Sequence, residues 1–229
     1  MVDQLRMNAG FFPTDKASLD RFSALYLGSL KQADLLGIWS LPNEHVLVRD
    51  LCPNARLATL SSLDAMIYEH PWSAQLAGRR VLVVHPFAAS IERQYRQNRE
   101  QLFRDPNVLP SFELTTVKAV QSILGRATGF ATWFDAYDFM CQEIGRAEFD
   151  VAIIGAGAYG LPLGAFVKSL GKQAVHMGGA TQLLFGIKGR RWETEFGEPY
   201  SGLVNEFWVR PSSDETPAGH ESIEGSAYW

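Results

Sequence analysis

Apolar and polar positions alternate along the chain in short blocks, and each block predicts one helix or strand. Over residues 14–31, apolar side chains recur at three- and four-residue steps, which predicts an amphipathic helix that begins near Pro13 and Thr14. Residues 35–39 have the length and apolar character of a strand. A helix is expected from residue 61 to about residue 70, with Pro71 marking a break within it or its end.

From residue 78 onward, strand-like apolar runs alternate with helix-like segments. Residues 81–84 form an unbroken apolar run, which is typical of a strand buried on both faces of a parallel sheet. The alternation predicts an α/β domain with a doubly wound, mainly parallel sheet and helices on both faces, a Rossmann-like arrangement. The expected strands are residues 81–84, 112–120, 149–154 and 173–176; the expected helices are residues 91–103 with Ser90 as a cap, a helix opened by a capping box of Thr132 and Asp135, and residues 159–170.

The 229 residues predict a single α/β domain over residues 1–210. Within it we expect a helical part over about residues 1–75 and a Rossmann-like part over about residues 78–210. Residues 211–229 differ in composition, since they contain Asp214, Glu215, Glu221 and Glu224 but no lysine or arginine. These residues are interpreted as an acidic C-terminal tail, and mobility is one explanation for it.

Charge and cysteine content narrow the class of protein. The formal net charge is -4, so the chain lacks the basic excess typical of nucleic-acid-binding proteins. Cys52 and Cys141 have neither metal-site spacing nor a disulfide pattern, and the N-terminus has no apolar signal region. Residues 151–167 form the longest uncharged run, but glycines and a proline interrupt it, which argues against an integral membrane segment. We therefore expect a cytoplasmic protein.

A glycine motif follows the strand expected at residues 149–154. Gly155, Gly157 and Gly160 have the G-x-G-x-x-G spacing, with Tyr159 inside the motif, and a helix is expected to begin there. Such glycines let the backbone approach a diphosphate, and the N-terminus of the helix attracts an anion. A site for NAD(P) also needs an acidic residue about 20 positions further on, and residues 173–177 contain none. Another phosphate-bearing ligand is therefore favoured, with a purely structural turn as the alternative.

A second glycine element, Gly178 and Gly179, follows the next expected strand and leads into Thr181 and Gln182. The carboxyl ends of neighbouring parallel strands lie at one edge of a sheet, where open α/β sheets bind ligands. We therefore expect the two glycine elements to share a site, with Thr181 and Gln182 adding hydrogen bonds. A turn followed by a capped helix is the structural alternative.

Basic residues and a histidine complete the candidate set. Lys188, Arg190 and Arg191 are predicted to bind phosphate and to offset leaving-group charge. A solvated basic turn, with Glu193 and Glu195 as partners, is the alternative. His85 ends the strand at residues 81–84 and is a candidate general base, unless nearby backbone groups simply satisfy it. His176 has the same two interpretations, with a weaker signal.

Several segments together resemble a bacterial family encoded beside polysaccharide genes and similar to glycosyltransferases of the GT-D fold type. The residues that support this are 8–13, 71–73, 78–87, 149–160, 176–192 and the closing Tyr228 and Trp229. The resemblance implies transfer of a sugar from a nucleotide-sugar donor with a divalent metal, Mn²⁺ or Mg²⁺. It also implies that Tyr228 and Trp229 fold back across the ligand edge. The acidic motif with which GT-D enzymes hold metal and nucleotide has no counterpart ahead of Asn8, and the metal ligands are unknown.

Three functional hypotheses remain open from the sequence. The first is a glycosyltransferase-like protein of surface polysaccharide biosynthesis that binds a nucleotide-sugar or another phosphate-bearing ligand at the carboxyl edge of the sheet. The second is an NAD(P)-binding oxidoreductase built on residues 155–160. The third is a non-catalytic binding or assembly module. The oligomeric state, a homo-oligomer included, is left open.

Overall fold

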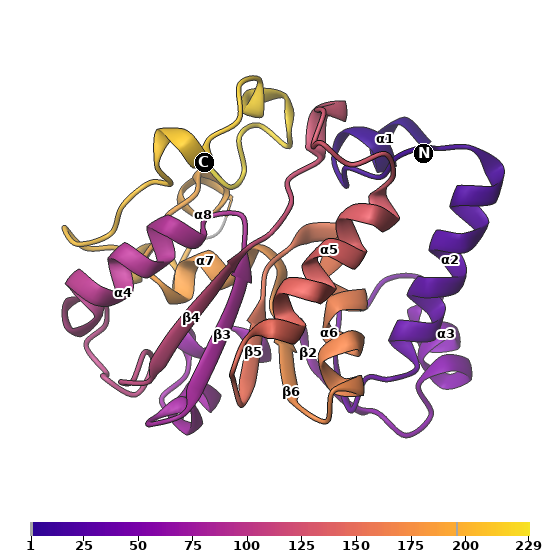
Figure 1. Ribbon diagram of the computed structural model, residues 1–229. Helices are drawn as coiled ribbons and strands as arrows, with labels where there is room; N and C mark the ends of the chain where they lie inside the picture. The colour runs from indigo at the N-terminus through magenta and orange to yellow at the C-terminus, as the bar shows by residue number, and fades with distance from the viewer. Residues whose placement is uncertain (1, 196) are drawn as a thin grey trace.

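The computed structural model describes residues 2–195 and 197–229, which fold around a parallel sheet (Figure 1). Four strands lie in the order β4-β3-β5-β6, and each neighbouring pair runs parallel. The predicted α/β class is therefore confirmed, with the chain wound in a Rossmann-like manner. The strands are β3 (Arg80–His85), β4 (Glu113–Lys118), β5 (Val151–Ile154) and β6 (Gln173–His176).

The burial of β3 explains why it lies inside the sheet. Val81, Leu82, Val83 and Val84 are all 0% exposed. Successive side chains of a strand point to opposite faces. Accordingly, Val81 and Val83 belong to the core on one face, whereas Leu82 and Val84 belong to the core on the other. A strand with no polar face needs a covering layer on both sides, and the helices provide it.

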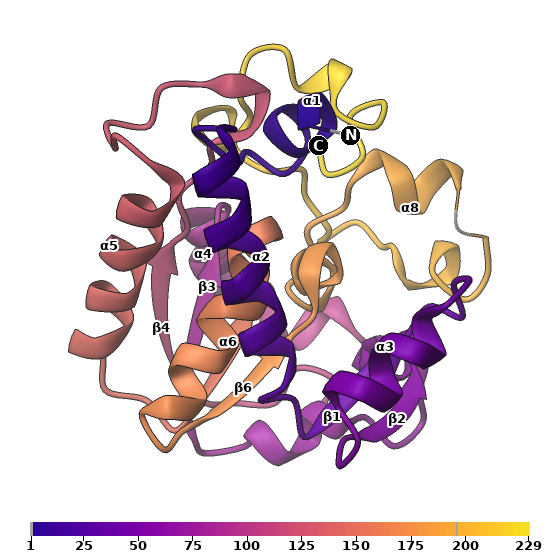
Figure 2. The same cartoon turned by 90° about the vertical axis from the view of Figure 1, so that its right-hand side faces the viewer.

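Helices cover the two faces of the sheet separately. Ile91 and Leu102 of α4 pack into one core, while Met140 of α5 and Leu163 of α6 pack into the other. Figure 2 shows α2 lying against α6, outside that second layer. After β4 the chain passes back across β3 and forms β5 on the other side of it. The winding of the sheet therefore changes direction between β3 and β5. The helices are α2 (Lys16–Leu30), α4 (Ala88–Leu102), α5 (Trp133–Arg146) and α6 (Gly160–Ser169).

The predicted helix starts are partly right. At α5 the capping box is confirmed, since Thr132 Oγ1 accepts from the Asp135 N–H at 3.1 Å and Asp135 Oδ2 accepts from the Thr132 N–H at 2.8 Å. Asp15, not Thr14, caps α2 by accepting from the Ser18 N–H at 3.0 Å. The prediction that Ser90 caps α4 is wrong. The helix begins at Ala88, two residues before Ser90, so Ser90 lies in its first turn.

The N-terminal part contains a second sheet that the sequence pattern did not predict as a whole. Strands β1 (Leu35–Ile38) and β2 (Arg56–Thr59) pair in parallel, and α3 (Glu44–Leu51) joins them. The expected helix over residues 61–70 is wrong, because this segment forms two separate 3-10 turns. Asp64 separates the turns with φ -84° and ψ 80°, and its carboxylate accepts from the Tyr200 hydroxyl at 2.5 Å. The backbone thus leaves the helical region at Asp64, where the side chain is engaged in a long-range contact.

Short elements fill the remaining connections. Besides α1 (Val2–Met7), these include α7 (Thr181–Leu184) and α8 (Arg190–Thr194). No helix in residues 2–195 and 197–229 has both the length and the apolar character needed to cross a membrane. The 3-10 turns are η1 (Leu60–Leu63), η2 (Ala65–Ile67), η3 (Trp72–Leu76), η4 (Ile123–Gly125), η5 (Gly157–Tyr159), η6 (Gly178–Ala180), η7 (Ser201–Leu203), η8 (Ser213–Glu215) and η9 (His220–Ser222).

The C-terminal segment, residues 211–229, packs onto the carboxyl edge of the sheet, at the top of Figure 1. Ile223 and Trp229 are 2% and 7% exposed and belong to the core on the α4 face. The Trp229 indole N–H donates to the Glu215 carbonyl oxygen at 3.1 Å. The C-terminal segment therefore has the folded-back arrangement, which was one of the two interpretations of its sequence.

Candidate functional site

The two glycine elements meet at the carboxyl ends of β5 and β6. Gly155 directly follows β5, and Gly178 follows β6 by two residues. A Cβ atom on Gly155 would lie only 2.6 Å from the Gly178 carbonyl oxygen and 2.6 Å from Thr181 Oγ1. The bends are therefore in direct contact, and their proximity matches the expectation from the strand order.

Each bend turns the backbone into a form that exposes successive N–H groups. Met177 has φ -98° and ψ -3°, and Gly178 follows at φ +57°. Ala156 has φ -125° and ψ 33°, and Gly157 follows at φ +51°. Met177 and Gly178 pair a right-handed residue with one of positive φ and so form a nest, a concavity whose N–H groups bind anions. Ala156 lies outside the right-handed region, so its bend with Gly157 is a turn of related shape, which we also call a nest. Within the described residues, no acceptor is found for the amides of Ala156, Gly157, Ala158, Gly178 and Gly179.

Three of the motif glycines face side chains of the protein itself. The Cβ position of Gly155 is occupied by the His85 ring as well as by Thr181, and that of Gly160 by the His176 ring. A Cβ atom on Gly179 would overlap the Tyr228 ring. Close packing within the protein therefore explains why these three positions lack a side chain.

Gly157 and Gly178 differ from those three. A Cβ atom on either residue would meet nothing within 4 Å. Both are also the left-handed residues of their nests, and Gly157 is exposed. At Gly157 and Gly178 the space beside the backbone is unfilled, and we refer to this space as the open side of the paired bends.

Thr181 and Gln182 brace the second bend from within the core. Both side chains are 0% exposed. Thr181 Oγ1 donates to the Ile154 carbonyl oxygen at 3.3 Å, which ties the bend to the end of β5. Gln182 Nε2 donates to the carbonyl oxygens of Ile187 at 3.2 Å and of Tyr228 at 3.1 Å. In this arrangement the two side chains position the bend, and neither faces the open side.

His85 and His176 lie near the bends but are held by backbone groups. His85 is 3% exposed, and its Nδ1 accepts from the Phe87 N–H at 3.0 Å. Burial lowers the pKa of His85 to about 3, so the ring is neutral. His176 Nδ1 lies 3.1 Å from the Ile154 carbonyl oxygen, and burial lowers its pKa as well. Both rings therefore have the backbone-satisfied arrangement that was the alternative to a catalytic role.

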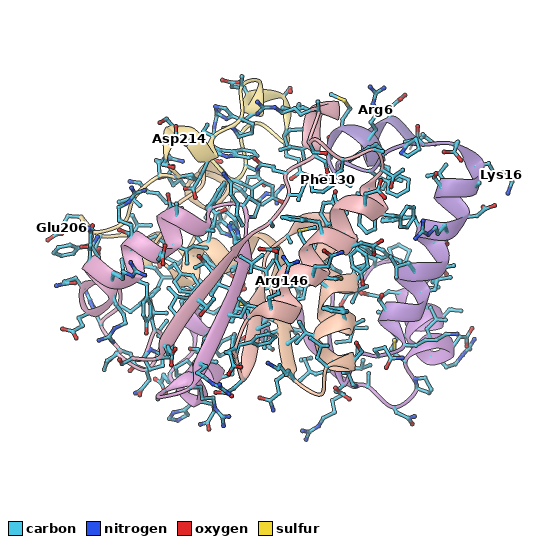
Figure 3. All side chains as sticks on the ribbon, viewed as in Figure 1. Arg6, Lys16, Phe130, Arg146, Glu206 and Asp214 are labelled. Atoms are coloured by element: carbon cyan, nitrogen blue, oxygen red, sulfur yellow. The ribbon has the colours of Figure 1, made fainter. Side chains whose placement is uncertain are left out.

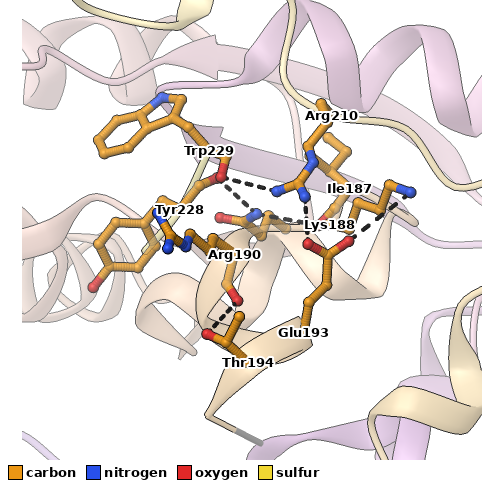
Figure 4. A network of polar contacts seen from close by, with 9 residues as sticks. Ile187, Lys188, Arg190, Glu193, Thr194, Arg210, Tyr228 and Trp229 are labelled. Carbon is orange, nitrogen blue, oxygen red and sulfur yellow. Dashed lines mark hydrogen bonds and ion pairs between the residues drawn. The ribbon is translucent and has the colours of Figure 1, made fainter. Parts of the chain in front are cut away.

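The basic segment forms an ion-pair network with glutamates and the C-terminal residues, as Figure 4 shows in part. Lys188 Nζ lies 3.9 Å from Glu193, and Arg191 Nε lies 3.7 Å from Glu195. These are the two partners expected for a solvated basic turn. The Arg190 N–H donates to the Trp229 backbone oxygen at 3.2 Å, and its side chain is exposed.

Tyr228 connects this basic segment to the second bend. Its ring packs on Gly179, and the guanidinium carbon of Arg191 lies 5.2 Å from the ring centre. Arg191 also donates to the Tyr228 hydroxyl at 3.3 Å and pairs with Glu224. The tail therefore covers the Gly179 side of the site and places one guanidinium group beside it.

Sequence reasoning missed one residue of this edge, Glu215. Its carboxylate accepts from the Ala89 N–H at 2.9 Å and the Ser90 N–H at 3.3 Å, at the N-terminus of α4. The side chain is 5% exposed. The protein itself thus supplies the anion at the helix that follows β3. The acidic composition of the tail was the available signal, but composition does not reveal which helix an acid reaches.

Side chains that could ligate a metal are not clustered within the described residues. These residues contain no cluster of three or more His, Cys, Asp or Glu side chains that could hold a metal ion. Residues 177–182, which follow β6, contain no carboxylate, the group that holds the ribose in NAD(P) sites. Comparisons with known proteins found no matching family model, no matching curated protein and no matching solved structure.

Proposed function

We propose that this protein binds a phosphate-bearing small molecule, of the nucleotide-sugar class, on the open side of its paired nests. The proposal rests on one observation. Two nests lie in contact at the carboxyl ends of adjacent parallel strands, and the residues that the structure describes supply neither an acceptor for five of their amides nor a side chain over Gly157 or Gly178. This edge is where ligands bind in open α/β sheets.

The chemistry of the nests favours phosphate over a neutral ligand. Each unpaired amide presents the positive end of a peptide dipole, and α6 begins directly after the first nest. A diphosphate has several acceptor oxygens and could use both nests at once. Arg191, beside Tyr228, places a guanidinium group near Gly179, where it also pairs with Glu195 and Glu224.

Sugar transfer is the finer part of the proposal and follows from the same placement. In such a transfer an acceptor hydroxyl attacks the sugar carbon that bears the diphosphate. The C–O bond to the diphosphate then breaks, and its electron pair leaves with the nucleotide. Amides that hold the diphosphate would stabilise this developing charge. The proton of the attacking hydroxyl passes to an oxygen of the departing diphosphate, because His85 is 3% exposed and its Nδ1 already accepts from the Phe87 N–H.

Isothermal titration calorimetry of the full chain with UDP- and GDP-sugars, with and without Mn²⁺, tests the proposal. The sharpest variants are Gly157→Asp and Gly178→Asp, each compared with the Asn variant at the same position. Asp and Asn both tolerate a left-handed backbone, so the pair differs in charge and not in shape. We expect each Asp variant to bind at least about tenfold more weakly than its Asn partner, because a carboxylate competes for the nest.

Two results would contradict the proposal. One is the absence of binding heat for every donor while circular dichroism shows a folded protein. The other is equal affinity of the Asp and Asn variants, which would place the ligand elsewhere. Titration with NADH in parallel tests the oxidoreductase alternative. Turnover of a bound donor, measured by release of the nucleoside diphosphate, tests the transfer step separately from binding.

A further inference from the structure

A pocket of about 220 Å³ opens at the same carboxyl edge of the sheet, beyond the end of β4. It lies between the N-terminal segment around α1 and the loop that joins β4 to α5. Figure 3 labels Arg6 and Phe130, one from each of these two segments, at the top of the molecule. Nothing in the sequence motifs pointed to this pocket. Its polar lining residues are Arg6, Ser122, Arg126 and Thr128, and its rings are those of Phe11, Phe12 and Phe130.

Hydrogen bonds and close packing hold the walls of the pocket together. Ser122 is 3% exposed, and its hydroxyl donates to the Gly10 carbonyl oxygen at 2.7 Å. Gly10 itself has φ +68°, and a Cβ atom there would lie 2.7 Å from the Ser122 backbone. On the other side, the Phe12 carbonyl oxygen accepts from the Trp133 N–H at 2.7 Å. A cavity built in this way is formed before a ligand arrives, which lowers the entropy cost of binding.

Two arginines at this pocket have no acidic partner in the part of the chain that the structure describes. No hydrogen bond or ion pair of the Arg6 or Arg126 guanidinium group is found within the described residues. Other arginines of the chain do pair with carboxylates, Arg80 with Asp150 and Arg146 with Glu143 among them. Arg6 lies over the exposed turn at Gly125, where a Cβ atom would be 3.3 Å from its Nε. Positive charge is thus concentrated here without compensation.

The lining defines the chemistry of a ligand. Guanidinium groups bind the oxygens of carboxylates and phosphates, often in a bidentate manner. Phenylalanine rings beside them favour an apolar or aromatic body. The volume of about 220 Å³ equals roughly seven waters at about 30 Å³ each, which suits a single ring with one acidic group.

We propose that this pocket, the Arg6–Arg126 pocket, binds a small organic acid: one oxyanion, a phosphate monoester or a carboxylate, carried on a single apolar ring. The oxyanion lies between the two guanidinium groups, and the ring lies against Phe12 and Phe130. The inference does not depend on the function proposed for the nests, because the two sites share none of the residues that would contact the ligands.

Calorimetry with phenyl phosphate and benzoate tests this inference, and the two probes distinguish a phosphate ester from a carboxylate. Benzyl alcohol keeps the ring without the charge, and inorganic phosphate keeps the charge without the ring. We expect phenyl phosphate or benzoate to bind at least about tenfold more tightly than either control. Equal binding of benzyl alcohol would contradict the role of the arginines, and equal binding of inorganic phosphate would contradict the role of the rings.

Variants locate the site. Arg6→Gln and Arg126→Gln are each expected to weaken binding of the better acid by about tenfold, because each removes one charge-assisted contact. Arg104→Gln is the matched control. Arg104 is exposed, has no hydrogen-bond or ion-pair partner within the described residues, and lies between α4 and β4, at the opposite edge of the sheet. It should bind within about twofold of the unmodified chain.

The nest variant Gly157→Asp separates this inference from the proposed function. It should leave the affinity for phenyl phosphate unchanged. If Gly157→Asp weakens binding while Arg6→Gln and Arg126→Gln do not, the probe occupies the nests and the inference is wrong. The absence of heat with both acids, for a folded protein, would also overturn it, whatever the nucleotide-sugar titrations show.

Discussion

Glu215 caps the helix that contains Ser90, although the two residues lie 125 positions apart in the chain. The Glu215 carboxylate accepts from the Ser90 N–H at 3.3 Å and from the Ser90 hydroxyl, and the Ala89 N–H donates to it at 2.9 Å. The local residue at the cap position, Phe87, has no side chain that can accept these bonds. A distant acid thus does what a Ser or Asp at the N-cap usually does.

Removal of this cap should destabilise the fold. We expect Glu215→Ala to lower the free energy of unfolding by about 2 kcal/mol, because it leaves buried N–H groups without an acceptor. Urea unfolding followed by circular dichroism measures the change. Asp214→Ala is the control, since Asp214 is exposed and adjacent. Equal stability of the two variants would show that the cap does not contribute.

Packing of Tyr228 on Gly179 should hold the C-terminal segment in place. Gly179→Ala would drive a Cβ atom into the Tyr228 ring, so we expect residues 211–229 to detach in part. Limited proteolysis should then cleave this segment faster than in the unmodified chain. Gly145→Ala is the control, because that helical position has open space around it. Cleavage at the same rate in both variants would contradict this role of Tyr228.

The ion pair between Arg80 and Asp150 should make stability depend on acid pH. The Arg80 side chain, through its hydrogen bond at 2.7 Å, lowers the pKa of Asp150 to about 2. The pKa of an unfolded Asp is about 4. The folded state therefore binds this proton less readily, so the stabilisation is present above about pH 4 and is lost as the pH falls toward 2.

We therefore expect the difference in unfolding free energy between the unmodified chain and Asp150→Asn to shrink as the pH falls through this range. Urea unfolding at several pH values between 2 and 6 measures it. A difference that stays constant with pH would mean that Asp150 acts through its shape and not through its charge.

Burial of His85 predicts a second pH effect, with the same sign and a different range. Its pKa in the folded protein is about 3, because desolvation disfavours the charged ring, whereas an unfolded histidine has a pKa of about 6.5. The unfolded chain thus binds the proton first, and the contribution of His85 to stability is full above about pH 6.5 and declines as the pH falls toward 3.

Nuclear magnetic resonance measures the protonation of the His85 ring directly. The His85 ring signals should not shift between pH 8 and pH 5, while free histidine added to the sample titrates near pH 6.5. Titration of the His85 signals in that interval would show that the ring reaches solvent, and it would revive its candidacy as a general base.

Local patterns were sufficient where neighbouring residues in the chain decide the structure. The apolar run at residues 81–84 indicated a fully buried strand, and Val81 and Leu82 indeed face two different cores. The capping box of Thr132 and Asp135 involves residues three positions apart, so it could be recognised without a fold. Alternation of strands and helices then predicted the parallel sheet, since a crossover helix is the usual connection between such strands.

The sequence failed where long-range contacts compete with local preference. Residues 61–70 have a helical pattern, but Asp64 bonds to Tyr200, and the segment becomes two short turns. The Arg6–Arg126 pocket joins residues near the N-terminus with residues 122–130, just past the middle of the chain, and no spacing rule connects them.

The glycines of the candidate site show most clearly what the sequence determines and what only the tertiary structure decides. The sequence by itself established that two glycine bends follow consecutive strands, because that depends only on the order of the elements. The fold decides which strands are neighbours, since β4 and β5 are also consecutive but β3 lies between them. It could not distinguish Gly178 from Gly179. Only the folded chain brings Tyr228 onto Gly179 and leaves Gly178 open. Any glycine leaves the space of a side chain empty. Whether a ligand or another part of the protein fills that space is decided by residues far away in the chain.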